Sequence, residues 1–261
     1  MITNTPDILK TDQTPLAKGP FSGKTVDVII PYYNEEGNVA GTHQSAAQLE
    51  ALFHIKHFIY INNGSGDGTS KELTDLAQEN PKVKIIHIEE NKGYGHGFKA
   101  GFSASTARYV ITNHADQQFD ATKFYTDILN ALNTLAPGYS VFSIRKGRPF
   151  AASLMTHLLR MALSAVLGTQ LKEFNGQPKL IDRSSLKQPI DAFPNDFSFD
   201  LMLYLASGDK KFYPILEQER ATGQSSWNRG LLSKYRLFKA YLASARKMKN
   251  LNRKTANTHG K

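Results

Sequence analysis

Short apolar runs alternate with amphipathic stretches along the first 115 residues. The apolar runs are rich in β-branched and aromatic residues, which is typical of buried strands. They are TVDVIIP (25–31), HFIYIN (57–62), VKIIHIEE (83–90) and RYVITNHA (108–115). The stretches between them have the spacing or the start signals of helices, at residues 38–53, at 70–80 with Ser70 as the cap, and from about 98 to 106. This alternation predicts an α/β fold with a mostly parallel central sheet flanked by helices.

Polar loops follow each of the four predicted strands. In parallel sheets, ligands bind outside the carboxyl ends of the strands, so these loops are expected to share one rim. They comprise residues 33–36, 62–69, 91–97 and 114–118. The convergence of four separate segments is the first indication of a binding site.

Two of these loops are rich in glycine. In NNGSGDGT (62–69) the glycines allow positive φ and close ligand approach, and Asp67 can cap the following helix. NKGYGHG (91–97) precedes a helix N-terminus, where a phosphate can bind, but its glycine spacing is not the dinucleotide fingerprint. Taken alone, NNGSGDGT is better explained as a tight turn between strand and helix, and neither loop is specific by itself.

The loop HADQQ (114–118) offers candidate metal ligands. Asp116 and Gln118, two residues apart at a strand end, can supply two oxygen ligands to a cation that also binds substrate phosphates. An Asp that caps a turn is the alternative. These residues alone do not separate the two interpretations.

Composition and charge narrow the class of protein. The 261 residues include no cysteine, which excludes disulfides and thiolate metal sites. We expect no secretory signal in residues 1–24, a polar arm, and no uninterrupted apolar run of about 18 residues that would indicate a spanning helix. The net charge is +9, but residues 229–261 hold ten Lys or Arg and no acid, so the basicity belongs to this tail.

Two further stretches are amphipathic. Residues 150–168 have a polar stripe and a broad apolar remainder, for which a helix packed in the core is the ordinary explanation. Residues 230–254 carry apolar positions at helical spacing among basic ones, which favours docking on an anionic lipid surface. Nucleic acid ranks lower as a partner because the apolar stripe has no use on a phosphate backbone. A helix packed on its own domain is the third choice.

The ordered motifs PYYNEE, NNGSGDGT, NKGYGHG and HADQQ together resemble family 2 glycosyltransferases, which have the GT-A nucleotide-sugar-binding fold. The resemblance is greatest to the branch that transfers sugars to polyprenyl phosphates, and it covers about residues 25–228. It continues in FNGQPKLIDRSSL (174–186), FSFDLMLYL (197–205) and ERATGQSSW (219–227). It implies a glycosyltransferase domain over 25–228, an arm over 1–24 and a basic amphipathic segment over 229–261.

The resemblance also assigns roles to residues. It implies nucleotide-sugar contacts at one set of positions, namely Pro31, Tyr33, Glu35, Asn63, Gly93, His114 and Arg145. It implies a metal held by Asp116 and Gln118, with Asp116 also counted as catalytic. Arg220 is expected near the transferred group, and Asp200 is the candidate base for a hydroxyl acceptor, with helix capping as its alternative role.

Asn63 and His114 depart from the family pattern, which has acids at both positions. Asn63 can accept a hydrogen bond from a base N–H and can also donate one, so a change of nucleotide is open. Imidazole is a poor ligand for Mg²⁺ but suits softer ions. Three outcomes follow: Mn²⁺ bound with help from His114, a metal held by Asp116 and Gln118 alone, or no obligatory metal. The second is favoured, because the family's first acid often acts toward the nucleotide.

The function implied is inverting transfer from a nucleotide-diphosphate sugar to a membrane-associated acceptor, a polyprenyl phosphate above all. The cofactor would be Mg²⁺ or Mn²⁺, and the location the cytoplasmic face of the cell membrane. One alternative is transfer to a sugar hydroxyl in surface polysaccharide or lipopolysaccharide synthesis. Another is a nucleotide-sugar-binding module without catalysis, which the two departures motivate.

Overall fold

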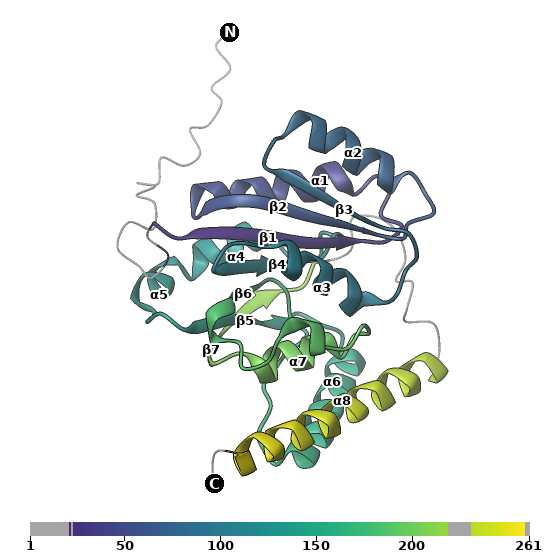
Figure 1. Ribbon diagram of the computed structural model, residues 1–261, viewed down its shortest axis with the longest axis vertical. Helices are drawn as coiled ribbons and strands as arrows, with labels where there is room; N and C mark the ends of the chain where they lie inside the picture. Colours follow the sequence, from purple (N-terminus) through teal and green to yellow (C-terminus); the bar gives the residue numbers. More distant parts are fainter. Residues whose placement is uncertain (1–20, 22, 219–230, 259–261) are drawn as a thin grey trace.

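A computed structural model describes residues 21, 23–218 and 231–258 of the chain (Figure 1). The strands are β1 (Thr25–Tyr32), β2 (His54–Asn63), β3 (Val83–Ile88), β4 (Tyr109–Thr112), β5 (Tyr139–Lys146), β6 (Lys179–Asp182) and β7 (Asp209–Leu216). The α-helices are α1 (Val39–Ala47), α2 (Thr69–Glu79), α3 (Tyr94–Ala104), α4 (Ala121–Asp127), α5 (Leu129–Thr134), α6 (Phe150–Leu167), α7 (Phe199–Ala206) and α8 (Leu231–Thr258). Short 3₁₀ turns cover Gln48–Ala51, Arg183–Ser185 and Ile190–Ala192.

The described strands form one seven-stranded sheet in the order β3-β2-β1-β4-β6-β5-β7. β6 is antiparallel to both of its neighbours, and the other pairings are parallel. The predicted mostly parallel sheet is therefore confirmed. Because β6 runs backwards, its first residue, Lys179, lies at the edge where the parallel strands end and pairs with Thr112 of β4.

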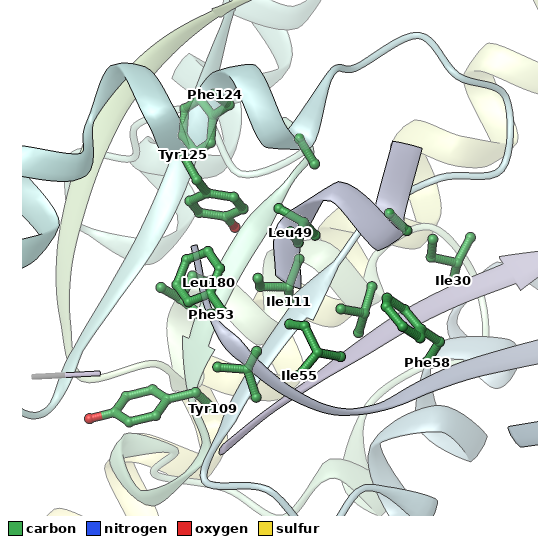
Figure 2. Packing of buried hydrophobic residues seen from close by; sticks show 14 of the residues in the cluster. Ile30, Leu49, Phe53, Ile55, Phe58, Tyr109, Ile111, Phe124, Tyr125 and Leu180 are labelled. Atoms are coloured by element: carbon green, nitrogen blue, oxygen red, sulfur yellow. The ribbon is translucent and has the colours of Figure 1, made fainter. Parts of the chain in front are cut away.

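Each face of the sheet is covered by its own hydrophobic layer. β1 shows the alternation: Val28 and Ile30 enter a cluster with α1 and α4, whereas Ile29 enters the opposite cluster with α3 and α7. Figure 2 shows the first cluster, where the Phe53 and Tyr125 rings meet edge to face at 5.2 Å. The predicted cover of helices on both faces is confirmed.

Some element boundaries differ from the predicted ones. The helix expected over 38–53 is α1 followed by the 3₁₀ turn, and β2 begins at His54, because its first residues already pair with β1. Ser70 is not the cap of α2. The N-cap is Gly68, and Asp67 Oδ1 accepts a hydrogen bond from the Thr69 backbone N–H at 3.1 Å.

Helix α6 leaves most of its apolar surface exposed. Of its side chains only Leu163 is buried, so the core-packed explanation for 150–168 is wrong. The exposed large apolar residues are Phe150, Leu154, Met155, Leu158 and Met161. In the described part of the chain, α6 is also the one helix long and apolar enough to cross a membrane, with a mean hydropathy of 1.5 over 18 residues.

Helix α8 lies beside α6 and contacts α7 (Figure 1). Its Tyr241 and Ala245 are buried, and the Tyr241 hydroxyl donates to Asn175 Oδ1 at 3.0 Å. The Lys249 ammonium donates to the Val166 carbonyl at 2.8 Å. Of the open choices for residues 230–254, packing on the chain's own domain therefore holds for this face of α8. Tyr235, on the predicted apolar stripe, is 55% exposed.

Candidate functional site

The strand ends bring the four polar loops to one edge of the sheet. Tyr32, the last residue of β1, pairs with Asn62 of β2. Asn63 pairs with Ile88 at the end of β3, and Ile29 pairs with Thr112 at the end of β4. The segments after β1, β2, β3 and β4 therefore start side by side.

The loops after β1 and β2 are joined by reciprocal hydrogen bonds. Asn34 Oδ1 accepts from the Gly66 N–H at 2.9 Å, and Asp67 Oδ2 accepts from the Glu36 N–H at 3.2 Å. Glu36 Oε2 accepts from the Gly68 N–H at 3.1 Å. A Cβ at Gly68 would meet the Glu36 carboxylate, so a larger residue there would displace the Glu36 side chain from this contact. Glu36 and Asp67 thus hold the rim together.

Glu35 lies in the loop after β1 and is held by contacts with Thr69 and Asn38. Its backbone N–H donates to Thr69 Oγ1 at 2.9 Å, and its carboxylate accepts from Asn38 Nδ2 at 2.6 Å. Pro31 is half-buried beside it, and Tyr33 is exposed. These contacts fix the Glu35 side chain at the end of β1, where the sequence predicted a nucleotide contact.

Asn63 is a buried residue with an unused acceptor. Its side chain is 3% exposed, and Nδ2 donates to the Gly93 carbonyl at 3.1 Å. Oδ1 has no hydrogen-bond partner among the described residues. Gly93 has φ +109, and a Cβ there would meet the Asn195 carbonyl at 2.4 Å, so only glycine brings this carbonyl to Asn63. The second N–H of Nδ2 donates to Asn91 Oδ1 at 3.4 Å, so the amide oxygen is the part of this side chain left without a partner among the described residues.

Asp116 lies in the loop after β4 and is 5% exposed. Its Oδ1 accepts from the Gln118 N–H at 3.3 Å. Gln118 is joined to the end of β7 by the hydrogen bond from the Gln218 N–H to the Gln118 carbonyl at 3.0 Å. A carboxylate and an amide from this loop fit a hard cation that takes its remaining ligands from phosphates. Within the described residues, no three His, Asp or Glu side chains form a metal-binding group.

His114 begins a chain of polar contacts that leads away from this loop. Its Nε2 is 2.9 Å from the Tyr94 hydroxyl, which is 3.0 Å from Asp200 Oδ2. Asp200 Oδ1 in turn accepts from the Lys179 ammonium at 3.0 Å. Burial lowers the pKa of His114, although the negative charges of Asp116 and Asp200 act in the opposite direction.

Lys179 is a fully buried cation. Burial lowers the pKa of its ammonium group, and the Asp200 carboxylate opposes this. The orientation of the Gln177 amide that satisfies both of its groups places its oxygen 2.8 Å from Lys179 Nζ. Asp200 stands in the first turn of α7, where Ser198 is the N-cap, so Asp200 does not cap that helix.

Arg145 is held at the end of β5 by a buried ion pair. Its Nη2 lies 2.7 Å from Glu173 Oε1, and the two side chains are 14% and 8% exposed. The Nε–H of Arg145 is buried without a partner among the described residues. The positive charge of Arg145 contributes to lowering the pKa of both His114 and Lys179. Arg220, the remaining predicted residue, lies outside the described residues.

Sequence reasoning missed Tyr94 and Lys179. Tyr94 stands inside the glycine-rich loop NKGYGHG, which was considered only for its backbone. Lys179 was missed because candidate residues were sought after the last residue of each predicted strand. β6 is antiparallel, so its first residue lies at the edge of the sheet where the other strands end. The segment QPKLID has only two apolar residues between Lys179 and Asp182, so the sequence carries no local signal for this strand.

A separate hollow lies at the opposite edge of the sheet, before β4 and after β6. Its volume is about 680 Å³, and its lining includes Arg108, Arg183 and Lys187. Arg108 is paired with Asp182, and Arg183 donates to the Ser105 and Ala107 carbonyls, so these guanidinium groups are used within the fold. The hollow contains none of the predicted site residues.

Comparisons with known proteins agree with this fold. Residues 27–188 match the family described as glycosyl transferase family 2. A glycosyltransferase of Synechocystis sp. is 26% identical over 211 residues, 78% of this chain and 64% of the relative. An undecaprenyl-phosphate 4-deoxy-4-formamido-L-arabinose transferase of Photorhabdus laumondii is 29% identical over 157 residues, 59% of this chain and 45% of the relative.

A solved structure supports the same fold. Glucosyl-3-phosphoglycerate synthase from Mycobacterium tuberculosis, in complex with Mn²⁺, UDP and phosphoglyceric acid, has a TM-score of 0.63 at 20% identity. The similarity covers 85% of this chain and 77% of that one. The chain thus has the GT-A fold, and it spans about 64% of the length of the first curated relatives. By the family match over most of its sheet, this chain belongs to the family 2 glycosyltransferases.

Proposed function

We propose that this protein is an inverting glycosyltransferase that moves a sugar from a nucleotide-diphosphate sugar to a lipid phosphate at a membrane surface. The observation that carries the proposal is a pair of acceptors on one edge of the sheet, the Asn63 carbonyl and the Asp116 carboxylate, each at most 5% exposed. Membership of family 2 supports the class of reaction. The name of the Photorhabdus relative supports the class of acceptor.

The base of the donor nucleotide is assigned to Asn63. Because Asn63 Nδ2 is engaged by the Gly93 carbonyl, the free Oδ1 selects a base that offers an imino N–H. Uracil, thymine and guanine have such a group, whereas adenine and cytosine present a lone pair at the matching ring nitrogen. A buried acceptor left without a donor costs about 1–3 kcal/mol, which disfavours the second group.

The diphosphate is assigned to the loop after β4. Asp116 and Gln118 would hold a divalent metal, which when bound would offset the charge of the diphosphate leaving group. The unpartnered Nε–H of Arg145 is a further donor on this side of the sheet. Arg220 is proposed near the transferred sugar. Preorganised cations where charge develops are the general means of lowering such a barrier.

The acceptor is proposed to arrive already ionised. A phosphate oxygen attacks the anomeric carbon from the face opposite the diphosphate, and the bond to the diphosphate breaks with its electron pair on the leaving group. No proton has to be removed. Asp200, the candidate base for a hydroxyl acceptor, is paired with Lys179 and accepts from Tyr94. Protonating it would leave a buried ammonium without its counter-charge, which favours the phosphate acceptor.

Docking on the membrane is assigned to α6 and α8. The exposed apolar face of α6 gives a surface that can enter the lipid interface, and α8 beside it carries exposed Arg236, Lys239, Arg246 and Lys247. Each cation near an anionic surface contributes about 1 kcal/mol. This arrangement supports a location on the cytoplasmic face of the cell membrane, where the proposed donor and lipid acceptor meet.

The test is a transfer assay with the full chain, undecaprenyl phosphate in detergent and a panel of labelled UDP-, GDP- and dTDP-sugars, with Mg²⁺, Mn²⁺ or chelator. We expect transfer from at least one donor, and loss of at least about 100-fold for Asp116→Asn, which keeps the shape and removes the charge. Asp127→Asn is the control, because Asp127 is exposed and pairs only with the neighbouring Lys123.

Two outcomes would overturn the proposal. Transfer only to sugar hydroxyls would support the polysaccharide acceptor instead. Binding of a nucleotide sugar without turnover under every condition would support a binding module without catalysis, the alternative that the departures at Asn63 and His114 motivate.

A further inference from the structure

We propose that Tyr94, held by the Lys179–Asp200 pair, fixes His114 as the tautomer with its proton on Nε2, so that Nδ1 presents a lone pair to the donor site as a ligand for Mn²⁺. The part of this inference that concerns Mn²⁺ rests on the proposed function. The part that concerns the His114 tautomer depends only on groups of this chain. The chain of contacts is Lys179, Asp200, Tyr94 and His114, with successive separations of 3.0, 3.0 and 2.9 Å.

The direction of each hydrogen bond follows from the groups at the far end. An ammonium only donates and an ionised carboxylate only accepts, so Lys179 donates to Asp200. Among the described residues, the donor to the second oxygen of Asp200 is the Tyr94 hydroxyl. The phenol oxygen has then given its single proton away and can only accept, which requires an N–H on His114 Nε2.

Burial of the same groups supports this assignment. Burial and the nearby Asp200 charge raise the pKa of Tyr94 well above its ordinary value, so the hydroxyl keeps its proton. Within the described residues no acceptor lies at His114 Nδ1 that would hold a second proton, so a single proton on Nε2 satisfies the contacts of the ring. The Gln177 amide is 3.4 Å from the phenol, farther than Asp200, and in the orientation that satisfies both of its groups its oxygen already accepts from Lys179, so it does not displace the carboxylate as the acceptor of the phenol proton.

The other nitrogen of the ring is left available. Within the described residues His114 Nδ1 has no hydrogen-bond partner, and the side chain is partly exposed. Of the charged groups near His114, the Asp116 carboxylate has the largest electrostatic interaction with the ring. An imidazole lone pair near a carboxylate binds borderline ions such as Mn²⁺ better than Mg²⁺. His114 would in this way retain the acceptor role of an acid without its charge.

The first measurement is the tautomer. In ¹⁵N-histidine-labelled full chain, the His114 signals, identified by their loss in His114→Gln, should be those of an Nε2–H, Nδ1-lone-pair ring. Tyr94→Phe should convert them to a mixture of tautomers. The phenylalanine keeps the ring stacked on Phe197 at 4.6 Å, so the fold should be retained. Tyr241→Phe, which removes another buried hydroxyl, should leave His114 unchanged. A proton on Nδ1 in the wild-type protein would overturn the inference.

The second measurement is UDP binding by calorimetry with Mn²⁺ or Mg²⁺. We expect UDP to bind more tightly with Mn²⁺ than with Mg²⁺. This preference for Mn²⁺ should fall roughly tenfold in both His114→Ala and Tyr94→Phe, which is typical when a metal ligand or the residue that orients it is removed. An unchanged Mn²⁺ preference in His114→Ala would refute the ligand half. If the wild-type chain bound no nucleotide with either metal, the proposed function would fail, while the tautomer result would stand.

Discussion

In the proposed site, Asn63 and His114 each provide a neutral acceptor where the family pattern has an acid, and a neighbour fixes the orientation of each. For Asn63 the neighbour is the Gly93 carbonyl, and for His114 it is the Tyr94 hydroxyl. Both neighbours come from the one glycine-rich loop after β3. That loop therefore serves the site through a carbonyl and a side chain, which its glycine spacing alone does not indicate.

Asn63 gives a prediction about nucleotide choice. Asn63→Leu removes the buried acceptor, so UDP should bind about 5- to 100-fold more weakly, which corresponds to the 1–3 kcal/mol of a lost buried hydrogen bond. ADP, which offers no imino N–H, should bind the wild type and the variant equally. Titration calorimetry of both nucleotides measures the difference. Equal losses for UDP and ADP would instead point to a general disturbance of the loop.

At the scale of elements, the sequence predicted the first half of the sheet well and the second half poorly. The strands β1 to β4 contain short apolar runs rich in β-branched and aromatic residues, so both their existence and the shared rim could be inferred. β6 is only Lys179–Asp182, it runs antiparallel, and it begins with a charged residue, so no local pattern marks it. The network of Lys179 with Asp200 and Tyr94 joins three segments far apart in sequence. Such contacts depend on the fold as a whole.

Helix α6 shows a related limit. Its apolar remainder predicted burial, because a single amphipathic helix usually packs on a core. The structure instead leaves the face containing Leu154, Leu158 and Met161 exposed. Periodicity identifies the apolar side of a helix but not its partner. An exposed apolar face of this kind is typical of a contact surface, and the lipid interface is the partner that we propose.

Helix α6 also provides a matched pair of substitutions. Leu154→Ser with Leu158→Ser should weaken sedimentation with anionic liposomes, while the free energy of unfolding changes by at most about 1 kcal/mol, because both side chains are exposed. Leu163→Ser, on the buried side, should destabilise the fold by about 2–5 kcal/mol. Liposome binding that is unchanged in the double variant would exclude this face as the contact.

At the scale of the whole molecule, Asp182 ties together the edge opposite the site. Its carboxylate is bound by Arg108 before β4, by Ser184 after β6 and by the Gly138 N–H before β5. Burial acts to raise the pKa of Asp182, but the hydrogen bonds from Arg108 and Ser184 outweigh it and lower the pKa.

The stability that Asp182 contributes should therefore depend on pH. Because its pKa is lower in the folded than in the unfolded state, the contribution is complete above the unfolded value of about 4 and is lost as the pH falls through the folded value. Asp182→Asn should reduce the free energy of unfolding by about 1–3 kcal/mol at pH 7 and by less at pH 3. Urea unfolding at both pH values tests this. A deficit that does not shrink in acid would exclude the charge as its cause.

The most direct test of the central claim is a crystal structure of the full chain soaked with UDP and Mn²⁺. The account predicts the uracil imino N–H against Asn63 Oδ1 and the diphosphate beside Asp116, at the edge where β1, β2 and β4 end. UDP bound elsewhere, for example in the hollow lined by Arg108, Arg183 and Lys187, would contradict it. So would a crystal in which the nucleotide does not bind at saturating concentration.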